Sequence, residues 1–248
     1  MNSFNHKEGI RIEESIQIKM RTYFSIQHIQ SAAIFCRLCQ KAENEYDGKF
    51  NQGLHTELRA YVTSTIFACV SFLEASINEI FCDATDSQNR LEVLGEDKIK
   101  LLSNMWEMSV PRTAAYSITD KYQITLTLLE KPLFDKGTTP FQDISILIRL
   151  RNALTHYEPE WFSSYSGIKA EIDNLNKLSR QLIGKFPASK PFEKTGNPYF
   201  PDKCLGYGCA KWAVLSCIKF TDEFYTKIGK EPTYNHVREN LQVELPKA

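Results

Sequence analysis

Two arginines, an asparagine and a histidine stand close together near the end of an apolar segment. At helical spacing Arg149, Asn152 and His156 share one side, because they are three and four residues apart. Arg151 lies toward a neighbouring face, but its side chain is long enough to reach the same space. Arginine carries a fixed fork of donors that matches phosphate oxygens, and histidine can transfer protons near neutral pH. The group therefore suits phosphate binding combined with proton transfer.

An amphipathic helix from Phe141 to His156 must position these side chains. Its apolar positions recur at helical spacing, at Ile144, Leu147, Ile148 and Leu154. Pro159 disfavours helical geometry at the preceding Glu158, so the helix should end within a residue or two of His156. A second interpretation stays open: His156 is simply a cation at the helix C-terminus, and the arginines are solvated or paired with acidic residues, Glu158 and Glu160.

The rest of the chain predicts an all-α fold, a helical bundle with long antiparallel helices and short connecting helices. A long first helix carries an apolar stripe from Ile12 to Leu38, which Gln27 and Gln30 interrupt. After a breaker at Gly48–Gly53, a second long helix from about Leu54 to Asp83 should pair with the first as an antiparallel hairpin.

Shorter segments follow, and we expect all 248 residues to form a single domain with a core of about residues 10–185 plus the last helix. The later expected elements are helices at Asp97–Met108, Thr119–Glu130 and Ile168–Phe186, a Pro-rich loop at 187–202, a last helix at 203–229 and a polar tail at 230–248.

Composition excludes some classes of protein. Thirty basic and thirty acidic residues cancel, so the chain lacks the overall positive charge that attracts nucleic acid at long range. Any RNA contact must be local or be built by oligomerisation. Met1–Met20 lacks the apolar stretch of a secretory signal, and no uninterrupted apolar run of about 18 residues predicts a membrane helix.

The cysteines indicate a reducing, cytoplasmic environment. They are seven, an odd number, and several fall on apolar helix faces: Cys69, Cys209 and Cys217. Cys36 and Cys39 have the spacing of half a zinc site, but without a second pair they are ordinary helix cysteines. The other histidines are scattered: His6, His28, His55 and His236. We therefore expect neither a metal nor a cofactor, and we interpret Gly206-Tyr207-Gly208 as a closely packed helix start.

The string from Arg151 to His156 resembles the Arg-x(4–6)-His motif of the HEPN superfamily, including the polar residue that commonly follows the arginine. The segment Phe67–Ile80 looks like the long helix that precedes the motif in such domains, and the resemblance covers roughly Leu54 to Tyr157. It implies an all-α domain and a metal-independent ribonuclease of the kind found in toxin–antitoxin and antiphage systems, where an antitoxin or regulatory protein is a possible partner.

Two details of the motif differ from the simplest match. Arg149 also has a permitted spacing to His156, but we prefer Arg151 because Asn152 follows it. In toxins of this family that are paired with nucleotidyltransferases, a tyrosine usually stands two positions after the histidine. Here Tyr157 is immediately adjacent, which argues against regulation by tyrosine nucleotidylation.

Glu74 and Asn78 lie four residues apart on the second long helix and so share one of its sides. If that helix packs beside the motif helix, Glu74 could bind Arg151 and Asn78 could orient His156. The alternative is a solvated pair at the edge of the apolar stripe.

Metal-free RNA cleavage needs a base, an acid and positive charge beside the phosphate. A single chain offers only one suitable histidine, and a two-fold dimer would supply two. The leading hypothesis is thus a homodimeric endoribonuclease, a toxin or antiphage effector. Two alternatives remain: a non-catalytic HEPN-like module that binds RNA or protein, and an all-α interaction protein whose motif is coincidental.

Overall fold

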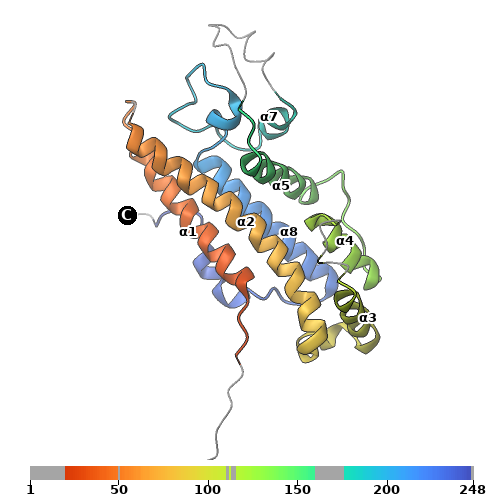
Figure 1. Ribbon diagram of the computed structural model, residues 1–248. Coiled ribbons are helices and arrows are strands. Elements are labelled where there is room, and N and C mark those ends of the chain that lie inside the picture. Colours follow the sequence, from red (N-terminus) through yellow and green to blue (C-terminus); the bar gives the residue numbers. More distant parts are fainter. Residues whose placement is uncertain (1–19, 50, 110–111, 113–115, 160–175, 247–248) are drawn as a thin grey trace, which may run out of the picture.

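The regular secondary structure of the described part consists of helices, with no strand, which confirms the all-α class. The structure is a computed structural model that describes residues 20–49, 51–109, 112, 116–159 and 176–246. Figure 1 shows its long helices side by side, with shorter helices along one flank.

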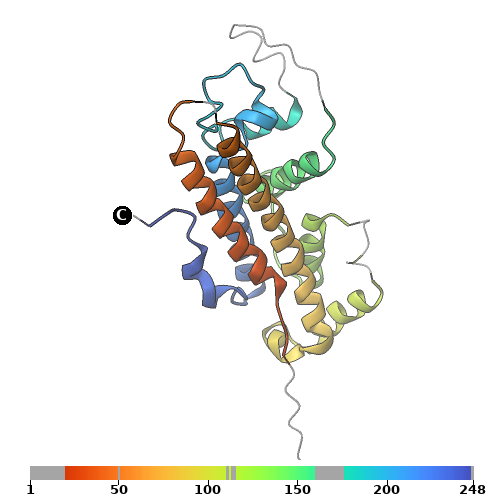
Figure 2. The same ribbon diagram turned by 60° about the vertical axis from the view of Figure 1, so that its left-hand side comes forward.

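Three long helices form the centre: α1 (Phe24–Asn44), α2 (Gln52–Asp86) and α8 (Tyr207–Ile228). The first two run antiparallel as the sequence predicted, and α8 packs against both (Figures 1 and 2). The buried side chains of α2 follow helical spacing, among them Leu58, Val62, Ile66, Val70, Leu73 and Ile77. Burying each such side chain contributes about 1.5–3 kcal/mol relative to exposure, so this stripe determines how the three helices pack.

Shorter helices cover one flank of this centre. They are η1 (Gln88–Leu94), α3 (Glu96–Glu107), α4 (Ile118–Leu128) and α5 (Phe141–Thr155). The bounds of α3, α4 and α5 agree with the predicted helices to within two residues, because the sequence carries clear start signals, whereas η1 was not predicted. Ser117 and Asp120, for example, form a reciprocal capping box at the start of α4.

An aromatic cluster holds α4 and the start of α5 against α8. Phe134 stacks on Phe220 with 4.5 Å between ring centroids, and Tyr122 meets Phe220 edge-on at 4.8 Å. The Tyr122 hydroxyl donates to the carbonyl of Leu73 on α2 at 2.8 Å. This packing fixes the N-terminal half of α5, and the far end of that helix projects toward α7 (Lys177–Leu182) and the short turn η3 (Tyr199–Lys203).

The first helix starts later than the sequence suggested. Residues 20–23 are not helical, and residues 1–19 lie outside the described part. Arg21 instead forms ion pairs with Asp83 and Asp86 at the end of α2, and the Tyr23 hydroxyl donates to Asp83 at 2.8 Å. These long-range contacts hold the chain extended before α1 begins at Phe24.

The last long helix also starts later, at Tyr207 rather than at residue 203. Residues 199–203 form η3, and Gly206 has an extended backbone that precedes the helix. Of the helix predicted at Ile168–Phe186, residues 168–175 lie outside the described residues, and Lys177–Leu182 is helical as α7.

The segment expected to be a polar tail folds onto the core in the structure. It forms η4 (Asn235–Leu241), and Tyr234, Leu241 and Val243 are buried. Arg37 of α1 donates to the carbonyl of Gln242, and Tyr207 donates to that of Val243 at 3.3 Å. The apolar residues of this segment are too few and too widely spaced to give a periodic signal, so only the packing identifies them as core.

By length and composition alone, α2 would suit a membrane span. Half of its most apolar window is buried inside the protein, where it packs against α1 and α8. Core helices of globular proteins share this property, so the helix is weak evidence for a membrane.

Candidate functional site

The C-terminal end of α5 carries the predicted motif. The helix ends at Thr155, and His156 follows as its C-cap with φ −110° and ψ 48°, its backbone N–H donating to the carbonyl of Asn152 at 2.8 Å. The predicted end of the helix is therefore confirmed. The opposite face of α5 is buried and anchors the helix through Phe141, Ile144, Ile146, Leu147 and Leu150.

The polar residues of this end differ in their exposure. Arg149, Asn152 and His156 are exposed, as expected for three residues on one side of a helix whose other side packs. Arg151 is half-buried on the neighbouring face, and its Nε atom is buried with no hydrogen-bond partner. A buried donor without an acceptor costs about 1–3 kcal/mol, so Arg151 keeps one unsatisfied donor at this end of α5.

Few side chains of the protein hold these groups in place. Arg149 donates to Oε1 of Gln181 on α7 at 3.2 Å. Between described residues, no ion pair joins Arg149 or Arg151 to Glu158, and Glu160 lies outside the described part. Tyr157 is 47% exposed, with its ring centroid 6.3 Å from that of Phe200 in η3.

Glu74 and Asn78 have a different partner from the one the sequence suggested. Both accept from the ammonium of Lys121 on α4, Glu74 Oε1 at 2.9 Å and Asn78 Oδ1 at 3.4 Å. The side chain of Lys121 is 4% exposed, so its charge is removed from water and held by these acceptors. The structure thus pairs Glu74 and Asn78 with Lys121 rather than with Arg151 and His156. The two residues support the packing of α4 on α2.

The sequence could not identify Lys121 as this partner. Lysine is usually a solvated residue, and spacing along a helix identifies a face but not the helix that packs on it. The one sign in the sequence that Lys121 is buried was its position inside a predicted helix. In the structure it lies on the same side of α4 as the buried Thr125.

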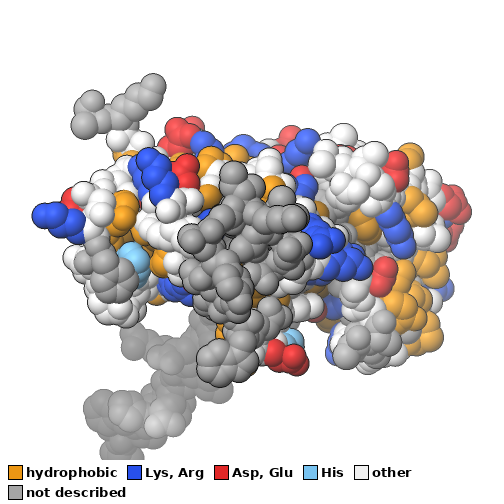
Figure 3. Space-filling model, turned by 90° about the horizontal axis from the view of Figure 1, so that it is seen from above, with side chains coloured by type: hydrophobic (Ala, Val, Ile, Leu, Met, Phe, Trp, Pro, Cys, Tyr) orange, Lys and Arg blue, Asp and Glu red, His pale blue; other side chains and the backbone are white. Residues whose placement is uncertain are grey.

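Charge is unevenly spread around the upper end of the molecule. Figure 3 looks onto this end and shows separate groups of Lys and Arg side chains, with acidic groups between them. The parts of this face that Figure 3 shows therefore carry local positive charge, although the net charge of the chain is zero. Positive side chains at the C-terminus of α5 also interact favourably with the helix dipole.

Cys36 and Cys39 lie in the core on α1, where they pack as small hydrophobes. Burial raises the pKa of the Cys36 thiol to about 12, and burial together with Glu43 raises that of Cys39 as well. Both thiols therefore stay protonated at neutral pH. Across the described residues, no group of three His, Cys, Asp or Glu side chains could hold a metal ion.

One cavity lies away from the motif and was not predicted from the sequence. It is lined by the end of α1, residues 185–190 and the first half of α8, and it brings four lysines together with aromatic side chains. These segments are far apart along the chain. Gly206 and Gly208, which the sequence predicts to be closely packed, were the one local sign of this cavity.

Neither a protein-family model, nor a curated protein, nor a solved structure matches this chain.

Proposed function

We propose that the protein is a metal-independent endoribonuclease of the HEPN type that acts as a homodimer. One observation carries the proposal: the end of α5 presents Asn152 and His156 to solvent beside Arg151, whose Nε has no hydrogen-bond partner. A helix end that served packing alone would not need an exposed imidazole next to a guanidinium whose buried Nε lacks an acceptor.

The proposed reaction cleaves the RNA backbone at a phosphodiester. His156 of one protomer removes the proton from a 2′-hydroxyl, and the 2′-oxygen attacks the adjacent phosphorus. A bond from the 2′-oxygen to phosphorus forms, the bond from phosphorus to the 5′-oxygen breaks, and the partner's His156 protonates that leaving oxygen. The products are a 2′,3′-cyclic phosphate and a 5′-hydroxyl.

The other motif residues serve this reaction through charge and position. Arg151 binds the phosphate and stabilises the charge that develops in the transition state. Asn152 precedes His156 by four residues and orients either the imidazole or the phosphate. The second protomer is needed because each chain supplies a single imidazole at this helix end, whereas the reaction uses both a base and an acid.

The test is a cleavage assay in EDTA on transfer RNA and messenger RNA. Wild type should cut, and His156→Ala should lose about 10²–10⁴-fold in rate because a proton-transfer group is missing. His236→Ala, which removes another exposed histidine in η4, is the matched control and should cut normally. Sedimentation should show a dimer, and the product ends should be cyclic phosphate.

Two outcomes contradict the proposal. In the first, wild type leaves both RNAs intact. In the second, the His156→Ala and His236→Ala variants cut equally well.

A second candidate is a non-catalytic HEPN-like module that binds RNA or a partner protein. The hydrogen bond from Arg149 to Gln181 and the half-burial of Arg151 favour it, since both suit a structural role. Such a module would leave RNA uncut in the cleavage assay, and it would shift the mobility of RNA in a gel-shift assay.

For the ribonuclease, we propose a role as a toxin or antiphage effector, which an antitoxin or other regulatory protein would restrain. Expression in a bacterial host should arrest growth for wild type and spare growth for His156→Ala.

A further inference from the structure

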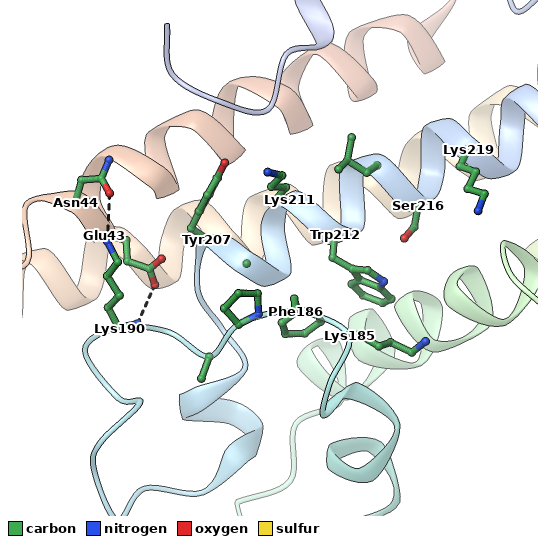
Figure 4. A pocket seen from close by; sticks show the side chains of 14 residues that line it. Glu43, Asn44, Lys185, Phe186, Lys190, Tyr207, Lys211, Trp212, Ser216 and Lys219 are labelled. Atoms are coloured by element: carbon green, nitrogen blue, oxygen red, sulfur yellow. Dashed lines mark hydrogen bonds between the residues drawn. The ribbon is translucent and has the colours of Figure 1, made fainter. Parts of the chain in front are cut away.

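A cavity of about 600 Å³ lies between the C-terminal end of α1, residues 185–190 and the first half of α8. Figure 4 shows its lining, with α8 crossing behind Trp212 and the segment containing Phe186 below it. The volume falls within the range of small-molecule sites. The residues of the α5 motif do not line it.

The cavity has fixed walls because one segment is held tightly against two helices. The carboxyl of Glu43 at the end of α1 is buried and accepts the backbone N–H of Lys190 at 3.1 Å. A Cβ at Gly206 would lie 2.7 Å from that carboxyl, and one at Gly208 would lie 2.6 Å from the carbonyl of Pro187. Only glycine permits this approach, so the predicted close packing at the start of α8 is confirmed and helps to shape the cavity.

Aromatic and aliphatic groups form the apolar part of the cavity. The rings of Phe186 and Trp212 lie 5.3 Å apart between centroids at an angle of 42°. Leu215, a large aliphatic residue three positions after Trp212 on α8, also lines the cavity and is 46% exposed. A flat apolar group can therefore contact Trp212 and Phe186 and remove their remaining surface from water.

The charged part is basic. Four lysines line the cavity, and two of them have carboxylate partners: Lys185 with Asp143 at 2.6 Å and Lys211 with Glu244 at 2.5 Å. The ammonium of Lys190 donates to the Asn44 amide oxygen at 3.4 Å, and its charge also acts on the nearby Glu43 carboxyl.

Lys219 is the lysine best placed to meet a ligand. It is exposed, and it has no ion pair with any described residue. Trp212, Ser216 and Lys219 follow one another at spacings of four and three, so they share one face of α8. Figure 4 shows Lys219 and Lys185 on the Trp212 side of the cavity.

We propose that this cavity binds a small amphipathic organic anion, a flat apolar body that carries one acidic group. The body packs on Trp212 and Phe186, and the acidic group, a carboxylate, sulfonate or phosphate, is bound by Lys219. The proposal goes beyond the ribonuclease function and does not depend on it.

The test compares two fluorescent probes that share one apolar body. These are 1-anilinonaphthalene-8-sulfonate, an anion, and N-phenyl-1-naphthylamine, which is uncharged. The folded protein should bind one molecule of the anion, with energy transfer from Trp212, and it should bind the neutral probe about tenfold more weakly. Trp212→Leu should weaken both probes, because it removes the surface on which the body packs.

The Lys219→Gln variant distinguishes the contribution of charge to probe binding from that of packing. It should weaken the anion about three- to tenfold and leave the neutral probe unchanged, and Lys219→Arg should restore the binding of the anion. Lys100→Gln, which removes an exposed lysine of α3 at the opposite end of the molecule, is the matched control. Circular dichroism of each variant shows that it is folded.

Three results overturn the proposal. The anion fails to bind saturably to folded wild type, both probes bind equally well, or Lys219→Gln binds the anion as tightly as Lys100→Gln does.

Discussion

Lys121 on α4 and Arg151 on the neighbouring α5 are two basic side chains whose surroundings differ. Lys121 on α4 is buried, and its ammonium is held by Glu74 and Asn78 of α2. At the end of α5, His156 is exposed, and Arg151 is half-buried with its Nε unpartnered. A buried charge is tolerated only when it is paired, so the first of these side chains is already satisfied by the protein itself. In the second, the Nε of Arg151 has no acceptor among the described residues.

This difference predicts which property each residue controls. Substitutions around Lys121 should change the free energy of unfolding and leave RNA cleavage intact. Substitutions at the end of α5 should change cleavage and leave stability nearly intact, since surface positions usually contribute within about 0.5 kcal/mol.

The largest expected effect concerns the two arginines of the motif. Arg151→Gln should lower the cleavage rate about 10²–10³-fold, because it removes charge beside the reacting phosphate. Arg149→Gln should cause a much smaller loss, since its guanidinium already donates to Gln181. Single-turnover rates in EDTA measure both. A larger loss for Arg149→Gln would make that residue the motif arginine.

Lys121→Ala should lower the free energy of unfolding by about 2–3 kcal/mol, since it removes a buried aliphatic stem and leaves Glu74 without its partner. Urea denaturation measures the loss. Lys121→Met keeps the stem and should be less destabilised. If instead Lys121→Ala were as stable as wild type but inactive, the contrast between the two groups would be wrong.

Glu74→Ala should cost about 1–2 kcal/mol of stability, because the buried Lys121 then keeps only the 3.4 Å contact with Asn78. The loss is smaller because the Glu74 side chain is 45% exposed and water screens the pair. Its cleavage rate should equal that of wild type. A slower rate at unchanged stability would instead support a role for Glu74 at Arg151.

The smallest expected change in stability concerns Glu43, whose carboxyl is buried in the wall of the cavity. Burial raises the pKa of its carboxyl, so between the unfolded pKa of about 4.3 and the higher native value the native state binds more protons. Its contribution to stability is therefore present at low pH and is lost as pH rises through this window.

Glu43→Gln keeps an acceptor for the N–H of Lys190 but removes this titration. The stability of the variant minus that of wild type should therefore increase between pH 4 and pH 7, as thermal unfolding at several pH values would show. A difference that is constant or decreases with pH would contradict this assignment.

Local signals in the sequence predicted much of the fold. Pro159 predicted where α5 ends. The apolar stripe of α2 predicted that this helix pairs with α1. The glycines at Gly206 and Gly208 indicated close packing, although not what packs there. Each of these signals depends on residues a few positions apart.

Contacts between distant segments could not be predicted in this way. The spacing of Glu74 and Asn78 gave their shared face, but the partner on it is Lys121, 47 residues beyond Glu74. For the same reason the start of α1, which depends on Asp83 and Asp86, and the cavity around Trp212 became visible only in the structure.

The segment after α8 has a consequence for how the protein is made. Leu245 donates its backbone N–H to Gln40, 205 residues earlier, and Cys36 contacts the carbonyl of Val243, 207 residues away. At roughly 5–20 residues per second, a ribosome needs about 10–40 seconds to synthesise the intervening chain. During that time this face of α1 is uncovered, so we expect nascent chains of this length to attract chaperones that bind exposed apolar helices.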